Sequence, residues 1–113
     1  MSVTKVHDRS ELGYLCFRYD VVLLACFEVE DGPFGVLATE FQRLADSEEY
    51  DRERVVFAKL DVKEVPECVK EFEICRMATL ITFYRREKDQ SFWGINPDDW
   101  QFIIKEGIKK VQN

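Results

Sequence analysis

The stretch at residues 21–40, VVLLACFEVEDGPFGVLATE, constrains the fold more than any other part of the chain. It begins with an apolar run, Val21–Phe27, which is too short to span a membrane and so predicts a buried β-strand. A Gly-Pro pair at 32–33 then leads into a pattern in which apolar residues recur every three or four positions, so we expect a helix from Phe34 to about Tyr50. Strand, turn and helix in this order open a parallel α/β unit, and sites form at the carboxyl end of such strands.

The length and the charge of the chain limit what it can be. Its 113 residues, of which 46% are hydrophobic, suffice for one core, so we expect a single domain over residues 1–113. The net charge of −6 repels phosphate backbones, which argues against direct nucleic-acid binding. No apolar stretch is long enough for a membrane span, and the first residues, MSVTKVHDRSEL, lack the apolar segment of a signal peptide. We therefore expect no membrane contact and a cytoplasmic or nuclear location.

The rest of the chain alternates between strand patterns and amphipathic helical patterns. Further strands are expected at residues 2–7, 55–60, 79–84 and 90–94, with a polar turn at 85–89. Further helices are expected after Asp8 or Ser10, from about Val65 and from Pro97. The predicted fold is therefore an α/β fold, in which a central mixed sheet of about five strands is flanked by four helices.

Several residues along this order resemble the thioredoxin family. The Gly-Pro pair at 32–33 matches the centre of the family's active-site motif, and Gly94 matches a glycine of its last strand. The segment FAKLDVKEVPECVKEF, with Asp61 and Pro66, looks like the family's strand–Asp-Val-Asp–helix segment. The resemblance covers essentially the whole chain and implies the thioredoxin fold.

The active-site motif of the family, W-C-G-P-C, corresponds here to Glu30, Asp31, Gly32, Pro33 and Phe34. A thioredoxin attacks disulfides with an exposed thiolate at a helix N-terminus, and a second thiol one turn later resolves the mixed disulfide. Asp31 and Phe34 stand at these two thiol positions. The resemblance therefore implies a degenerate active site, and we expect no dithiol disulfide reductase activity.

Two other landmarks of the family site are also replaced. Ala25 stands where the family keeps a buried acid in the strand before the motif, and Ala78 stands where it keeps a cis-proline. A cis bond before a residue other than proline costs about 3 kcal/mol, so we expect a trans bond between Met77 and Ala78. These losses strengthen the prediction that the chain is not an enzyme.

The four cysteines, Cys16, Cys26, Cys68 and Cys75, form no CxxC pair, and we expect them to be reduced. Cys26 lies within an apolar strand and is expected in the core. Cys75 precedes Ala78 by three residues, which makes it the candidate reactive thiol; the competing interpretation is an ordinary, partly buried cysteine. The sequence indicates no metal site and no cofactor.

The main functional hypothesis is a redox-inactive, non-catalytic thioredoxin-like domain that acts as a protein-binding or adaptor module. Its binding residues would be Glu30, Asp31, Phe34, Met77 and Trp93, which would line a groove near Asp31 with apolar and acidic side chains. A protein partner or a second copy of the chain would occupy this groove. In the competing interpretation, Phe34 folds inward and fills the space of the absent site.

Two alternative functions remain open from the sequence. The first is a single-cysteine redox enzyme or thiol sensor that uses Cys75. The second is a thioredoxin-fold subunit of an RNA-processing complex, because the KEVPEC-to-FYRR stretch is loosely similar to a spliceosomal thioredoxin-fold protein that lacks the cysteine motif.

Overall fold

The apolar run at the start of residues 21–40 forms β2 (Val21–Phe27), the central strand of the sheet. All of its residues are buried. The computed structural model describes residues 3–28, 32–47 and 49–112. Before β2 come β1 (Val3–Val6) and α1 (Arg9–Arg18), and after it come α2 (Gly32–Asp46), β3 (Val55–Asp61) and α3 (Pro66–Glu71). The chain ends with β4 (Thr79–Tyr84), β5 (Glu87–Trp93) and α4 (Pro97–Lys109).

The five strands form one mixed sheet in the order β1-β3-β2-β4-β5. β1 and β2 both run parallel to β3, whereas β4 runs antiparallel to both β2 and β5. The predicted architecture, a five-stranded mixed sheet with four helices, is confirmed. Within the described residues, no helix combines the length and the apolarity that crossing a membrane requires.

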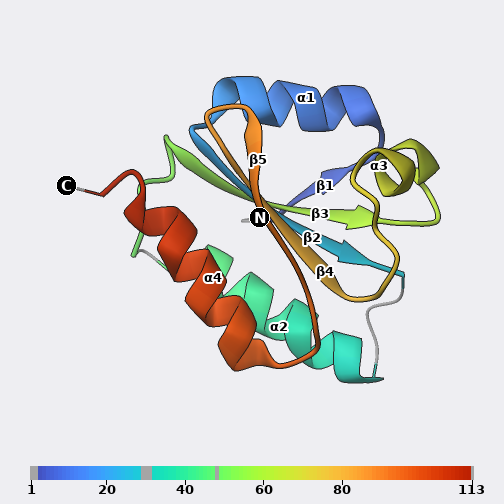
Figure 1. Cartoon of the computed structure of the whole chain (residues 1–113). Helices are drawn as coiled ribbons and strands as arrows, with labels where there is room; N and C mark the ends of the chain where they lie inside the picture. Colours follow the sequence, from blue (N-terminus) through green and yellow to red (C-terminus); the bar gives the residue numbers. More distant parts are fainter. Residues whose placement is uncertain (1–2, 29–31, 48, 113) are drawn as a thin grey trace.

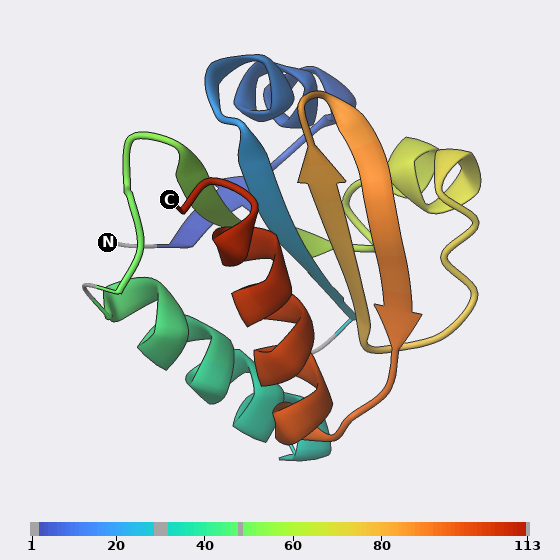
Figure 2. The same cartoon turned by 60° about the vertical axis from the view of Figure 1, so that its left-hand side comes forward.

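Two helices cover each face of the sheet (Figure 1). Alternate residues of β2 point to opposite faces: Leu23 and Ala25 pack under α2 and α4, while Leu24 and Cys26 pack under α1 and α3. The second view shows the same arrangement (Figure 2). A strand that is covered on both faces needs apolar residues at every position, which explains the unbroken apolar run.

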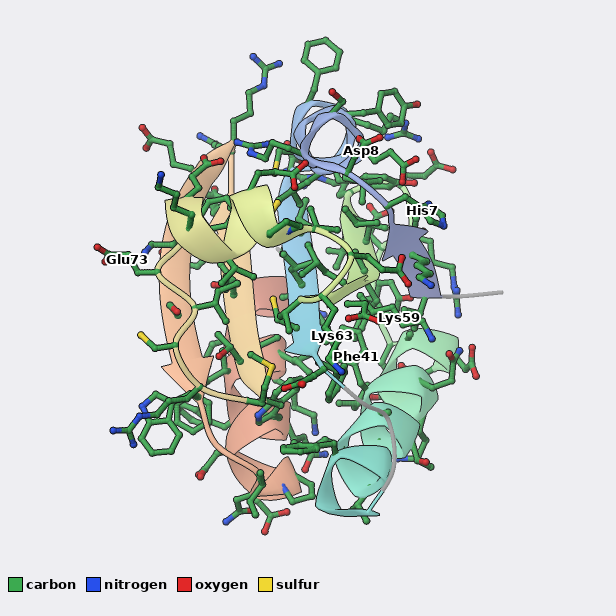
Figure 3. The ribbon with its side chains drawn as sticks, turned by 90° about the vertical axis from the view of Figure 1, so that its right-hand side faces the viewer. His7, Asp8, Phe41, Lys59, Lys63 and Glu73 are labelled. Atoms are coloured by element: carbon green, nitrogen blue, oxygen red, sulfur yellow. The ribbon has the colours of Figure 1, made fainter. Side chains whose placement is uncertain are left out.

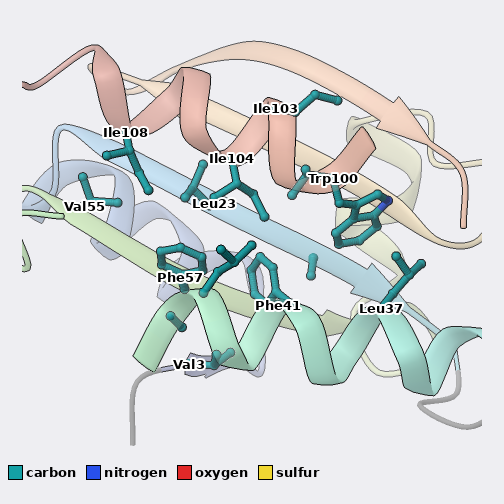
Figure 4. Packing of buried hydrophobic residues seen from close by; sticks show 14 of the residues in the cluster. Val3, Leu23, Leu37, Phe41, Val55, Phe57, Trp100, Ile103, Ile104 and Ile108 are labelled. Carbon is teal, nitrogen blue, oxygen red and sulfur yellow. The ribbon is translucent and has the colours of Figure 1, made fainter. Parts of the chain in front are cut away.

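The larger core lies between the sheet and the pair α2 and α4 (Figure 4). Trp100 of α4 stacks on Phe27, with ring centroids 5.7 Å apart. Phe41 of α2 packs edge to face with Trp100, with ring centroids 6.1 Å apart. The indole N–H of this buried tryptophan donates to the carbonyl of Gly94 at 3.0 Å, so its polar atom is paired. These contacts anchor the end of β5 to α4.

The helix after β2 ends earlier than its sequence pattern predicts. α2 runs from Gly32 to Asp46, not from Phe34 to about Tyr50. The Ser47 hydroxyl donates to the carbonyl of Leu44 at 2.7 Å, and the Tyr50 hydroxyl donates to that of Ala45 at 2.6 Å. Tyr50 also packs its ring on Phe57, so the chain folds back onto the core in place of a further helical turn.

The β4–β5 turn is shorter than predicted. β5 begins at Glu87, not at Gln90, and Tyr84 pairs directly with Glu87. Arg85 and Arg86 both have positive φ, 51° and 76°, as the common two-residue hairpin turns require. The sequence hid this turn because neither position carries the glycine or asparagine that usually signals it.

The helix starts follow side-chain chemistry that the sequence contains. Asp8, one of the two predicted caps, accepts a hydrogen bond from the backbone N–H of Glu11 at 2.9 Å and caps α1. Pro66 is the first residue of α3, where its missing N–H costs nothing. Asn96 caps α4 by accepting a hydrogen bond from the N–H of Asp98.

Candidate functional site

The fold brings the predicted site to the carboxyl end of β2, where α2 begins. Ala25 is fully buried in β2, between Lys59 of β3 and Leu80 of β4 in the sheet register. Gly32 is the first residue of α2. Two of the predicted binding residues, Glu30 and Asp31, lie outside the described residues.

The loop before β4 faces the same edge, and its geometry corrects one prediction. The Met77–Ala78 peptide bond is cis, not trans. One contact from a distant segment reaches this loop, because the N–H of Gly94 donates to the carbonyl of Ala78 at 3.0 Å. Within the loop, the Thr79 hydroxyl donates to the carbonyl of Arg76. The prediction used only the intrinsic preference of an isolated peptide bond, which tertiary contacts override here.

Phe34 and Met77 pack against different parts of the core. Both are half-buried, but Phe34 packs against the core under α2 and α4, whereas Met77 packs against the core under α1 and α3. Each side chain thus leans inward on its own face of the sheet. The prediction that Glu30, Asp31, Phe34, Met77 and Trp93 bind a partner or a second copy stays a prediction.

Trp93 belongs to a small pocket that the sequence did not indicate. Its side chain is 55% exposed, and the guanidinium of Arg76 lies 4.4 Å from the centre of its ring. These two residues line a pocket of about 100 Å³ together with Cys75, Thr79 and Ser91. The pairing of Thr79 with Trp93 in the β4–β5 register explains this proximity.

The four thiols differ sharply in their surroundings. Cys26 is fully buried in β2, as predicted, and burial raises its pKa to about 12. Burial also raises the pKa of Cys16, which is half-buried, and of Cys68, which is buried. Cys75 is the exposed thiol, and its Sγ donates to the carbonyl of Glu73 at 3.2 Å. Thiols with a raised pKa react slowly near neutral pH, so Cys75 is the candidate nucleophile.

The connection from α3 to β4 keeps Cys75 at the surface. Glu73 has a positive φ of 54°, which turns the chain away from α3, and Ile74 is buried directly before Cys75. Figure 3 shows Glu73 on this connection, on the opposite side of β2 from Lys59. The α3–β4 connection thus carries the thiol to the edge of the sheet where the cis bond lies.

The described residues contain no group of three or more His, Cys, Asp or Glu side chains arranged to hold a metal ion. His7 pairs with Glu11, whose Oε1 lies 2.9 Å from Nδ1. Both side chains are exposed, so this is a surface contact of α1 and its preceding residue.

Comparison with known proteins identifies the family. No family model matches the chain. The chain is 31% identical to the thioredoxin Asp f 29 of Aspergillus fumigatus over 87 residues. The aligned segment covers 77% of each protein. The chain belongs to the thioredoxin family. Thioredoxin structures share its fold: that of Malassezia sympodialis (Mala s 13) has a TM-score of 0.83 at 23% identity, over 94% of this chain and 90% of that one. The structure of the Schistosoma mansoni thioredoxin pre-protein has a TM-score of 0.81 at 24% identity, over 96% of this chain and 100% of that one.

Family membership corrects the main functional prediction. The sequence led us to expect a redox-inactive adaptor that is not an enzyme, but the matched relative and the similar structures are thioredoxins. The prediction was wrong because it gave the absence of a CxxC pair more weight than the family resemblance, and so placed the single-cysteine redox alternative second. These matches favour the single-cysteine redox alternative, and they lend no support to the RNA-processing alternative.

Proposed function

We propose that this thioredoxin-family protein carries out thiol–disulfide exchange through one cysteine, Cys75. The observation that carries the proposal is the contrast among its thiols: burial raises the pKa of Cys16, Cys26 and Cys68, while Cys75 is exposed. A thiol must reach its substrate and lose its proton to attack a disulfide. Cys75 is the thiol whose exposure meets the first of these requirements.

The surroundings of Cys75 suit a disulfide substrate. The pocket of about 100 Å³ beside it is lined by the Trp93 ring, Arg76 and Glu73, so it offers an aromatic surface together with charged groups of both signs. Cys75 lies two residues before the cis bond that starts at Met77. A substrate in the pocket would therefore meet both the thiol and the loop that faces the start of α2.

The reaction needs no second protein thiol. The Cys75 thiolate attacks one sulfur of a disulfide R–S–S–R′, forms the mixed disulfide Cys75–S–S–R, and releases R′–S⁻, which takes up a proton from water. A low-molecular-weight thiol such as glutathione then loses its proton, attacks the R sulfur, forms G–S–S–R and releases the Cys75 thiolate. In the net reaction, R–S–S–R′ and one molecule of the small thiol become the mixed disulfide G–S–S–R and the free thiol R′–SH.

A one-cysteine cycle is also what the motif positions favour. Asp31 and Phe34 stand at the two thiol positions of the family motif, so this chain has no resolving thiol there. The external thiol takes that role. The residues at the motif positions thus support a single-thiol route within a redox protein.

The proposal is tested by glutathione-dependent reduction of hydroxyethyl disulfide, with each thiol blocked in turn by substitution. We expect the wild type to accelerate the reaction and Cys75→Ser to fall to the uncatalysed rate. The matched control Cys16→Ser changes a half-buried thiol and should keep the activity. Mass spectrometry of the trapped intermediate should find glutathione or hydroxyethanethiol on Cys75. A Cys75→Ser variant as active as the wild type, or a wild type no faster than glutathione alone, would refute the proposal.

A further inference from the structure

A second pocket, at the other end of β4 from Cys75, lies between α1, α3 and the β4–β5 hairpin. It has a volume of about 310 Å³ and is lined by Arg9, Cys16, Phe17, Phe72, Arg86 and Lys88, among others; we call it the α1 pocket. Both cartoon views show the hairpin turn beside α1 (Figures 1 and 2). We propose that the α1 pocket binds an acidic peptide segment through one apolar side chain and its flanking carboxylates.

The base of the α1 pocket is aromatic and fixed. Phe83 of β4 is buried, and the half-buried Phe72 meets it edge to face, with ring centroids 5.5 Å apart. The guanidinium of Arg9 lies 5.6 Å from the centre of the Phe72 ring. An apolar side chain that enters the pocket therefore meets preorganised aromatic surface, which lowers the entropic cost of binding.

The rim of the α1 pocket is positively charged in a chain whose net charge is −6. Glu71 does not cancel this charge, because Arg9 holds it in a two-point pair, with Nε–Oε1 and Nη2–Oε2 distances of 2.7 and 3.1 Å. Within the part of the chain that the structure describes, neither Arg86 nor Lys88 forms an ion pair. Two uncompensated cations beside an aromatic base are the complement of an acidic segment.

The backbone places these cations over the base. Lys88 is the cross-strand partner of Phe83, so both side chains belong to the sheet face that α1 and α3 cover. The guanidinium of Arg86 lies 4.6 Å from the centre of the Phe17 ring. The hairpin therefore sets one charge beside the Phe83–Phe72 base and one against α1.

An exposed aromatic face of α1 borders the α1 pocket. Phe17 is 68% exposed and Tyr14, one turn earlier, is 62% exposed. Large apolar side chains grouped on a small domain usually mark a contact surface. Because the surface combines this apolar group with cations, a peptide that carries both apolar and acidic residues fits it better than a purely charged ligand, and the net charge of −6 disfavours a nucleic acid.

The test uses a fluorescein-labelled peptide in which one phenylalanine is flanked by two glutamates on each side, with binding measured by fluorescence anisotropy. We expect saturable binding by the wild type at low salt, and at least about a tenfold loss of affinity in Arg86→Glu/Lys88→Glu. Both side chains are exposed, so this variant should fold, which circular dichroism checks. The control Lys63→Glu/Lys105→Glu makes the same change in net charge at exposed positions outside the α1 pocket and should bind like the wild type.

Cys16 provides a second readout because it lines the α1 pocket. In a Cys75→Ser background, bound peptide should slow the alkylation of Cys16, and the Arg86→Glu/Lys88→Glu changes should abolish that protection. Since Cys75 is absent from this background, the readout is independent of the proposed redox function.

Three results would overturn the proposal. The first is equal binding of a peptide whose phenylalanine is replaced by serine, which would mean charge attraction alone. The second is binding without protection of Cys16, which would place the peptide elsewhere. The third is concentration-dependent self-association in sedimentation that Arg86→Glu/Lys88→Glu abolishes, which would make a second copy of the chain the occupant.

Discussion

At the scale of single residues, Gly107 sets how closely α4 approaches the central strand. A Cβ at this position would lie 3.0 Å from Leu23 Cδ2 and 3.7 Å from Val21 Cγ1. A valine there would force α4 away from β2 and strain the packing beneath it. We expect Gly107→Val to lower the free energy of unfolding by about 1–3 kcal/mol, measured by urea denaturation.

Gly13 in α1 is the matched control for this change. A Cβ there meets Arg9 Nη1 at 3.5 Å, an ordinary contact with a flexible side chain. Gly13→Ala should therefore raise the free energy of unfolding by about 0.5–1 kcal/mol through helix propensity. If Gly107→Val were as stable as the wild type, the close approach of α4 to β2 would not be a packing constraint.

At the scale of elements, the β4–β5 hairpin is built on a turn that its residues disfavour. Arg85 and Arg86 both adopt positive φ, which asparagine and glycine accept at lower cost. We expect Arg85→Asn/Arg86→Gly to raise the free energy of unfolding by about 0.5–1 kcal/mol, because both new residues accept positive φ more readily than arginine. The gain is reduced because the arginine contacts with Tyr84 and Phe17 are lost. Thermal unfolding followed by circular dichroism measures the change.

A control separates turn geometry from these side-chain contacts. Arg85→Ala/Arg86→Ala removes the same contacts and keeps residues that disfavour positive φ, so it should be less stable than the wild type. If both double variants shifted the melting temperature equally, backbone geometry at the turn would not be the cause.

At the scale of the whole molecule, titration of paired carboxylates and buried thiols predicts a stability maximum near neutral pH. A hydrogen bond from Arg43 lowers the pKa of Glu40, and one from Arg9 lowers that of Glu71. A carboxylate whose pKa is lower in the folded than in the unfolded chain stabilises the fold at a pH above its unfolded-state pKa, about 4.3. This stabilisation is lost as the pH falls through the folded-state pKa. These pairs are at the surface, so each contributes below about 1 kcal/mol.

The alkaline side of the maximum comes from the thiols. Burial raises the pKa of Cys26 to about 12 and also raises those of Cys16 and Cys68. The unfolded chain loses these protons near pH 8.5 and the folded chain does not, so stability falls as the pH rises above 8.5 toward the folded values. Each thiol adds a slope of at most about 1.4 kcal/mol per pH unit.

Urea denaturation at intervals from pH 3 to pH 10 measures both sides of this profile. Cys26→Ala should be less stable at pH 7, because it loses buried volume, but its stability should fall less steeply above pH 8.5. The comparison concerns the slope and not the absolute stability. An unchanged slope in this variant would show that Cys26 does not control the alkaline side.

Much of the fold could be read from local patterns. The apolar run Val21–Phe27 predicts a strand covered on both faces, and β2 has these bounds. Asp8, Pro66 and Pro97 predict helix starts, because caps and prolines act through backbone groups close to them in the chain. Apolar period and turn chemistry depend on near neighbours, so the sequence by itself determined the order of elements and the family resemblance.

The candidate site depends on contacts between distant segments, which only the tertiary structure decided. Contacts from Gly94 accompany a cis bond at Ala78, where the local preference is trans. Phe34 and Met77 lie near one edge of the sheet but pack on opposite faces. The exposure of Cys75 and the charge of the α1 pocket arise in the same way. Burial and charge pairing are set by what the rest of the chain places beside a side chain, and local sequence does not contain that information.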